Sequence, residues 1–199
     1  SLRALQVDCI DVYMIHKVQW EKELEEVLSP AGALEGLRKA QEEGKIGFVG
    51  VAAHRVDLLH DALVTNEFDV VQLPCNALDP WIFNPVLSTA RRLDIGVIAM
   101  KALAGGQLSH QAIPALQFAL GQPYHSLVVG MSTVEQVQLD VGETMRFDGM
   151  SQERKQKVVE ETSHLGDHLC RLVCTKHCVS RCPHEVPIAD VLRLERYRA

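Results

Sequence analysis

Five short apolar runs, each followed by a helical pattern, constrain the fold of this chain more than any other feature. These runs are rich in β-branched residues and lie at residues 7–16, 46–51, 69–73, 96–100 and 126–130. Each has the length of a strand and the continuous apolar character of a strand buried in a parallel sheet. Strands that alternate with helices through short linkers favour a parallel sheet, either doubly wound or closed into a barrel. Right-handed crossovers then place the helices outside the sheet.

Glycine placement separates the two architectures. Gly50, Gly96 and Gly130 and the pair Gly105-Gly106 do not form a G-x-G-x-x-G fingerprint, so a dinucleotide-binding doubly wound sheet has no direct support. A complete barrel needs eight strand–helix units and about 250 residues, whereas this chain has five units in 199 residues. The sequence therefore predicts an α/β fold with a partial (β/α)8 barrel.

Residues typical of helix caps mark the ends of the expected helices. Ser29-Pro30 opens the first, which ends at Gly44. Ser132 and Thr133 are alternative N-caps of another, which runs to about residue 145. The remaining helices are expected at residues 56–63, 85–94, 111–120, 151–163 and 187–197. The polarity of residues 151–163 places a boundary near residue 148, between a barrel part at 1–148 and a helical, cysteine-rich tail at 149–199.

Composition excludes several classes of function. Hydrophobic residues make up 47% and charged residues 23% of the chain, which is ordinary for a globular protein. The formal charge of −6 and the pI near 5.8 argue against a nucleic-acid surface, which needs a basic face. No apolar run reaches the length of a membrane span, and no signal peptide opens the chain. We expect a cytoplasmic protein; since the chain starts at Ser1 rather than Met, it resembles a piece of something longer.

His16 is the first candidate for chemistry, because it ends the first predicted strand. In α/β proteins, ligands bind and reactions occur at the carboxyl ends of parallel strands. A core histidine satisfied by a backbone carbonyl is the alternative interpretation.

Four of the six cysteines fall in one run with a spacing of four residues: Cys170, Cys174, Cys178 and Cys182. Without a secretory signal, such clustering suggests a metal or a cluster rather than disulfides. On a straight helix the outer pair would lie about 18 Å apart, so a site with four thiolates requires a non-helical run. Zinc, with His168, His177 or His184 assisting, and reduced structural cysteines are the alternatives.

Five segments together resemble the second half of the aldo/keto reductases, in order and spacing. They are SLRALQVDCIDVYMIH, GALEGLRKAQEEGKIGFVGVAAH, DVVQLPCNALDP, IGVIAMKALAGG and LVVGMSTVEQV. The cysteine run, continued by CPHEVPIADVLRL, is similar to the tail of the subgroup that carries a ferredoxin-like iron–sulfur motif, although the related clusters use tighter spacing. The resemblance implies the C-terminal portion of an eight-stranded barrel and, at the tail, a 4Fe–4S cluster.

The same resemblance implies NAD(P)H-dependent hydride transfer to or from a small carbonyl or alcohol. His16 matches the family's catalytic histidine, which hydrogen-bonds the reacting oxygen. The Asp, Tyr and Lys that complete the family's catalytic set belong to its first three strands, which this chain does not contain. We therefore expect the chain alone to be inactive.

For the cofactor, the resemblance implies residues at and after the later strand ends. These are His54, Gln72, Asn76, Met100, Lys101, Leu103, Gly105, Gly106, Gly130, Ser132, Thr133, Gln136 and Asp140. Gln72 matches the glutamine that holds the nicotinamide amide, and the loop from Lys101 to Gly106 matches the one under the pyrophosphate, where glycines let backbone N–H groups approach phosphate. The resemblance also implies that the start of the helix after Ser132 faces the adenosine phosphate. The absence of a basic residue near Ser132 leaves the choice between NAD and NADP open.

Two further hypotheses stay open. The chain could be a non-catalytic iron–sulfur or zinc module, with a redox partner for the cluster and a degenerate barrel as scaffold. It could also be a truncated fragment whose outer strands present open edges.

Overall fold

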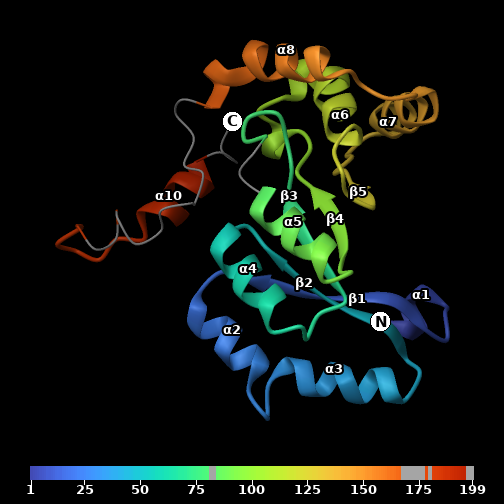
Figure 1. Ribbon diagram of the computed structural model, residues 1–199, viewed down its shortest axis with the longest axis vertical. Helices are drawn as coiled ribbons and strands as arrows, with labels where there is room; N and C mark the ends of the chain where they lie inside the picture. The colour runs from blue at the N-terminus through green and yellow to red at the C-terminus, as the bar shows by residue number, and fades with distance from the viewer. Residues whose placement is uncertain (81–83, 167–177, 179–180, 196–199) are drawn as a thin grey trace. The chain divides into compact units, whose positions relative to one another are not determined.

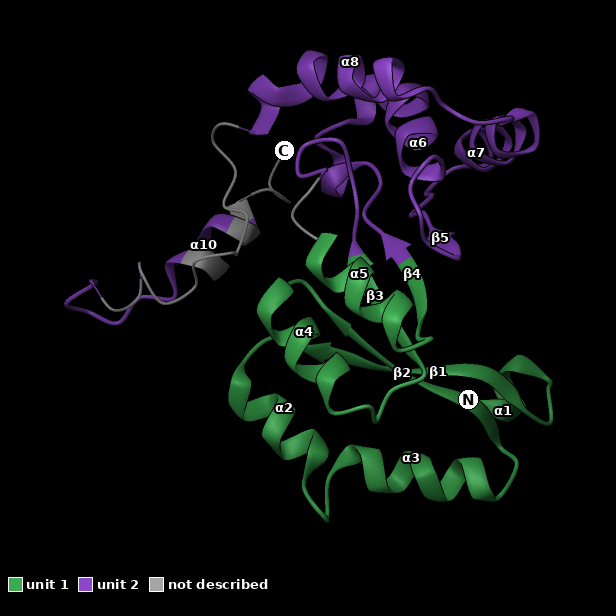
Figure 2. Cartoon of the chain, viewed as in Figure 1, with its two compact units in different colours: residues 1–73, 83–98 green, residues 74–82, 99–199 purple. Residues whose placement is uncertain are grey.

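The computed structural model describes residues 1–80, 84–166, 178 and 181–195. The chain forms two compact units, drawn in different colours in Figure 2. The first, unit 1, comprises residues 1–73 and 83–98, and the second, unit 2, comprises residues 74–82 and 99–199.

A five-stranded sheet has its strands in sequence order (Figure 1). The strands are β1 Ile10–Val18, β2 Ile46–Ala53, β3 Val70–Pro74, β4 Gly96–Met100 and β5 Ser126–Val128. The ladders that join β1 to β2 and β2 to β3 are parallel. Sequence order is the order of a barrel, whereas a doubly wound sheet reverses its strand order at a switch point. The predicted α/β fold with five strand–helix units of a partial barrel is confirmed.

Helices alternate with the strands. They are α1 Leu2–Leu5, α2 Glu21–Leu28, α3 Ala33–Glu42, α4 Val56–Val64, α5 Asn84–Arg92, α6 Ala112–Leu120, α7 Val134–Arg146, α8 Gln152–Thr162 and α10 Ile188–Glu195. Short 3-10 turns occur at η1 Ala104–Gly106, η2 Ser109–Gln111 and η3 Ser163–Gly166. Within the described ranges, no helix is both long and apolar enough to cross a membrane.

The first predicted helix cap was wrong. Ser29 follows α2 rather than opening α3, and its hydroxyl donates to the Glu26 carbonyl at 2.8 Å. The extra helix, α2, begins where the Glu23 carboxylate accepts the N–H of Trp20 at 3.1 Å. The charged character of residues 17–26 concealed this helix, which buries only Leu24. The predicted stop is correct, since Gly44 follows α3 with a φ of 71°.

The expectation that the first strand is buried was also wrong. Along β1 only Val18 is buried, and Tyr13 is 36% exposed. The physical reason is the position of β1 at the end of the strand order, where it pairs with β2 alone among the described strands. An edge strand has open space on one side, whatever its apolar content.

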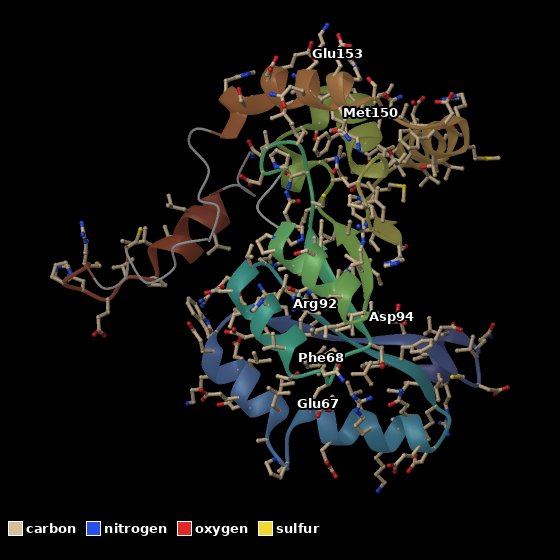
Figure 3. All side chains as sticks on the ribbon, viewed as in Figure 1. Glu67, Phe68, Arg92, Asp94, Met150 and Glu153 are labelled. Atoms are coloured by element: carbon tan, nitrogen blue, oxygen red, sulfur yellow. The ribbon has the colours of Figure 1, made fainter. Side chains whose placement is uncertain are left out.

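The core of unit 1 lies between β2, β3 and the helices α4 and α5. Its fully buried side chains include Val49, Val51, Leu58, Leu59, Leu63, Val71, Leu73 and Val86. Phe68, which follows α4, is also buried (Figure 3). Its neighbour Glu67 (Figure 3) accepts hydrogen bonds from Arg38 of α3 through its carbonyl, at 2.5 Å, and its carboxylate. These contacts connect α3 with the loop before β3.

Unit 2 has its own core, in which α6 and α8 meet. Leu108, Phe118 and Val158 are buried there, and Met150 (Figure 3) packs against them. Lys155 of α8 donates to the carbonyl of Gly121 at the end of α6. The first helix of the predicted tail therefore packs on the last part of the predicted barrel. The division into units does not coincide with the boundary at residue 148, and the domain division itself stays a prediction.

Candidate functional site

Register brings two of the predicted site residues into one row of unit 1. His16 of β1 pairs with Ala52 of β2, and Ala52 pairs with Gln72 of β3. Residues in register on parallel strands face the same side of the sheet, and neighbouring strands are about 4.8 Å apart. The Cα atoms of His16 and Gln72 are thus about 10 Å apart, with a methyl group between them. We call these three residues the His16–Gln72 row.

The row lies at the carboxyl ends of its strands and is accessible. Two residues of β1 follow His16, and the register shifts between His16 and Val18. His16 is exposed and Gln72 is half-buried, whereas Ala52 is fully buried. A small ligand group can therefore contact an imidazole on one side and a carboxamide on the other.

Arg55 is a buried charged residue that sequence reasoning missed. It lies between β2 and α4, and its side chain is only 6% exposed. Its guanidinium donates to Asp57 at 3.0 Å, to Glu21 at 3.0 Å and 3.3 Å, and to the carbonyl of Gln19 at 3.4 Å. Arg55 therefore fastens the segment after β1, which carries His16, to the start of α4.

The pKa shifts of Arg55 and Asp57 agree with these hydrogen bonds. The hydrogen bond with Asp57 raises the pKa of Arg55 above its ordinary value; burial opposes this effect, and Glu21 adds to it. Burial alone would raise the pKa of Asp57, but the hydrogen bonds from Arg55 and from the N–H of Leu58 lower it overall. Because Glu21 and Arg55 are far apart in the sequence, spacing gave no signal for this pair. His54, the neighbouring predicted cofactor residue, is half-buried.

The loop after β4, in unit 2, contains the expected phosphate-binding residues. Lys101, Ala104, Gly105 and Gly106 have positive φ values of 61°, 50°, 69° and 102°. A Cβ atom added at Gly105 would meet nothing within 4 Å, so a ligand can approach the backbone there. Two N–H groups are already used inside the loop, since Ala104 donates to Lys101 at 2.8 Å and Gly106 donates to Leu103 at 2.9 Å.

Asn76 and Leu103 have evident structural roles. Asn76 is 7% exposed, and its side-chain oxygen accepts the N–H of Leu78 at 3.0 Å. Leu103 packs against the core of unit 2. Met100, at the end of β4, is half-buried, and its carbonyl accepts the N–H of Cys75 at 2.8 Å. Cofactor contacts by these residues stay predictions.

Thr133, rather than Ser132, is the N-cap of α7. The Thr133 hydroxyl accepts the N–H of Gln136 at 3.3 Å, and the Gln136 side chain accepts the N–H of Ser132 at 2.6 Å. Glu135 lies in the first turn, where hydrogen bonds from its own backbone N–H and from Thr133 lower its pKa. Gly130 is exposed, and a Cβ atom there would meet nothing within 4 Å. The start of α7 therefore already carries a carboxylate.

Asp140 lies further along α7 and is buried. Its exposed fraction is 9%, and burial raises its pKa. It lines an otherwise almost wholly apolar pocket of about 300 Å³ between α6, β5 and α7.

The cysteine run is only partly described. Cys170 and Cys174, like His168 and His177, lie outside the described residues. Cys178 and Cys182 are free thiols that line one pocket together with Arg181 and Ile188. Among the residues that the structure describes, no group of three or more His, Cys, Asp or Glu side chains could hold a metal ion.

Comparison with solved structures supports the fold. The aldo-keto reductase AKR11C1 from Bacillus halodurans, in its apo form, matches with a TM-score of 0.63 and 18% identity over 80% of this chain and 64% of that one. A Pseudomonas aeruginosa protein described as an aldo-keto reductase matches with a TM-score of 0.56 and 23% identity over 73% of this chain and 54% of that one. The chain thus spans less than two thirds of the length of these proteins. At such identities the likeness shows the fold alone.

A family-level comparison of the sequence gives the assignment. The profile of the aldo/keto reductase family matches residues 1–114, which is more than half of the chain. The matched segment contains the His16–Gln72 row and the loop after β4. The chain belongs to the aldo/keto reductase family.

Proposed function

We propose that this chain is the part of an NAD(P)H-dependent oxidoreductase that binds the nicotinamide and orients a small carbonyl or alcohol substrate. The observation that supports this proposal most is the His16–Gln72 row, which presents an imidazole and a carboxamide on the same side of three parallel strand ends. Membership of the aldo/keto reductase family supports the reaction class.

The two polar groups of the row have complementary tasks. When bound, the reduced nicotinamide would supply the hydride that adds to the carbonyl carbon, and a proton from water would complete the alcohol. The amide of Gln72 has both a donor and an acceptor, which suit the carboxamide of a nicotinamide ring. The imidazole of His16 donates a hydrogen bond to the substrate oxygen, where negative charge develops. Ala52 leaves room between them.

The loop after β4 fits a phosphate group. Gly105 is open to the approach of a ligand, and Lys101 supplies a positive charge in the same loop. Phosphate contacts at Lys101, Gly105, Gly106 and Gly130, with Ser132, Thr133 and Gln136 at the start of α7, belong to the proposal. So does the prediction that the chain alone does not turn over substrate, because the family resemblance assigns the remaining catalytic residues to strands other than the five matched here.

Titration of the chain with NADH and NADPH, followed by calorimetry, tests the proposal. Binding is expected, and Gln72→Ala should weaken it by about tenfold because one amide pair is lost. Gln152→Ala is the matched control, since Gln152 begins α8 in a helix turn exposed to solvent. Folded chain that binds neither nucleotide would contradict the proposal, as would equal loss of affinity in both variants.

We also propose that the cysteine run binds a metal or a 4Fe–4S cluster, which would need a redox partner. The shared pocket of Cys178 and Cys182 and their free thiols support it. Anaerobic purification with iron and zinc analysis provides the test. A Cys178→Ser, Cys182→Ser double variant should lose the metal, and metal-free wild-type protein would refute this second proposal.

A further inference from the structure

Met14 lies beside the His16–Gln72 row, on the same face of the sheet. It comes two residues before His16 on β1, so the two residues face the same side and are about 7 Å apart along the strand. In the register, Met14 pairs with Gly50 of β2, and Gly50 pairs with Val70 of β3. This second row of three residues therefore lies directly below the first.

The side chain of Met14 extends from β1 onto β2. A Cβ atom added at Gly50 would overlap the Met14 sulfur and would lie 2.8 Å from its methyl carbon. The same Cβ atom would be 3.0 Å from the carbonyl oxygen of Val70. The thioether of Met14 therefore occupies the place that a side chain of β2 would otherwise take.

This arrangement gives the second row one accessible side chain. Gly50 is buried and Val70 is 9% exposed, whereas Met14 is half-buried. Glycine in the interior of a strand marks a place where another group approaches the backbone closely, and here that group is the thioether. A thioether is apolar, polarisable and flexible, and methionine is common on binding surfaces. A ligand group that extends from the first row toward the second therefore contacts Met14.

We propose that Met14 limits the size of one substituent of the carbonyl substrate, so that the chain accepts aldehydes and methyl ketones in preference to ketones with longer chains. This inference rests on the proposed function, in which the imidazole of His16 holds the substrate oxygen. The carbonyl carbon then lies over Ala52. One of its two substituents extends toward the Met14 thioether, and the other leaves past the strand ends. A hydrogen atom or a methyl group fits above the sulfur, whereas a propyl group must displace it.

Binding of two ketones to the full chain, saturated with NAD⁺, tests the inference. NAD⁺ cannot reduce a ketone, so the complexes do not react. The probes are acetophenone, whose carbonyl carries a methyl group, and butyrophenone, which has a propyl group in its place. The wild type should bind acetophenone about tenfold more tightly or better, since a mismatch of one methylene in an apolar site already has an effect of this size.

Methyl NMR locates the bound ketone. Acetophenone should shift the methyl signal of Met14 and leave that of Met145, which is 84% exposed on α7, unchanged. A Met14 signal that stays in place while acetophenone binds would overturn the inference.

Three variants separate the thioether from the rest of the site. Met14→Ala should bind butyrophenone as tightly as acetophenone, and its retained binding of acetophenone shows that it is folded. Met14→Leu restores a side chain of similar volume and should restore the preference. Met145→Ala, which removes an exposed methionine instead, should keep the preference of the wild type.

The outcomes distinguish this inference from the proposed function. If the chain binds no nicotinamide nucleotide, both fail. If it binds the nucleotide but binds neither ketone, or binds both ketones equally, only the inference about Met14 is overturned. The same holds if Met14→Ala keeps the full preference for acetophenone.

Discussion

Burial alone does not tell whether a polar residue supports the fold or a ligand; its partners do. Asn76 and Asp140 are about equally buried, at 7% and 9% exposure. The Asn76 oxygen is bonded to the backbone of Leu78, which explains its burial by local structure. The Asp140 carboxylate has no such bond within the described residues. Its partial removal from water therefore disfavours the charged form and raises the pKa of Asp140.

Asp140→Asn should stabilise the chain at neutral pH. Because burial raises the folded-state pKa of Asp140, the folded chain gives up this proton less readily than the unfolded chain. Protonation of Asp140 therefore stabilises the folded chain. This stabilisation is fully present below the ordinary pKa of 3.8 and is lost as the pH rises through the raised pKa of the folded chain. The variant escapes that loss, so its free energy of unfolding at pH 7 should exceed that of the wild type.

Urea unfolding at pH 7 and at pH 4 measures this effect. The difference in unfolding free energy between variant and wild type should shrink toward pH 4. A difference of the same size at both pH values would show that the amide acts through packing rather than through charge.

Glu135 bears on the choice between NAD and NADP. Its carboxylate stays ionised at the start of α7, and residues 126–140 contain no Lys or Arg. A 2′-phosphate is repelled at this position, so we predict that the chain binds NADH more tightly than NADPH. Glu135→Lys should improve NADPH affinity roughly two- to fivefold and leave NADH affinity nearly unchanged. Calorimetric titration of both nucleotides provides the measurement, and an equal change for both would contradict the prediction.

At the scale of elements, Arg55 joins three segments through one buried guanidinium. Arg55→Met should lower the free energy of unfolding by about 1–3 kcal/mol, since the Gln19 carbonyl and two carboxylates lose a donor. Arg38→Met is the matched control. Arg38 also joins an ion-pair network, with Glu67 and Asp69, but its side chain is 34% exposed. Removal of the Arg38 guanidinium should lower the free energy of unfolding by less than about 1 kcal/mol. If urea unfolding gave the same loss of unfolding free energy for both variants, the buried Arg55 network would contribute no more to stability than the exposed Arg38 network.

The five strands could be predicted from the sequence because each is a short β-branched run with a turn on either side. Their burial could not, because a run such as residues 10–18 has the same composition at the edge of a sheet as in its middle. The helix α2 was missed for the opposite reason: it buries one side chain, Leu24, and its charged surface has the composition of a loop. Local patterns specify elements, and only pairing specifies which face is covered.

The candidate site was predictable to the same extent. His16 and Gln72 could be proposed from strand ends and from the family resemblance, but their common row depends on the register of two ladders. Arg55 could not be found, because its partner Glu21 comes from a distant segment. The pocket of Asp140 was hidden as well, since its walls come from α6, β5 and α7.

At the scale of the whole molecule, the chain is a family member that covers 64% of the length of one solved relative and 54% of another. Its two units carry different parts of the proposed function. Unit 1 holds the His16–Gln72 row, and unit 2 holds the glycine loop and the start of α7. On the proposed function, the His16–Gln72 row receives the nicotinamide ring.

Nuclear Overhauser contacts between bound NADH and the isotopically labelled chain test this binding position. We expect contacts from the nicotinamide ring protons to the imidazole of His16 and to the side-chain amide of Gln72, with none to the exposed imidazole of His110. Bound NADH whose nicotinamide protons contact neither His16 nor Gln72 would show that the row does not receive the ring.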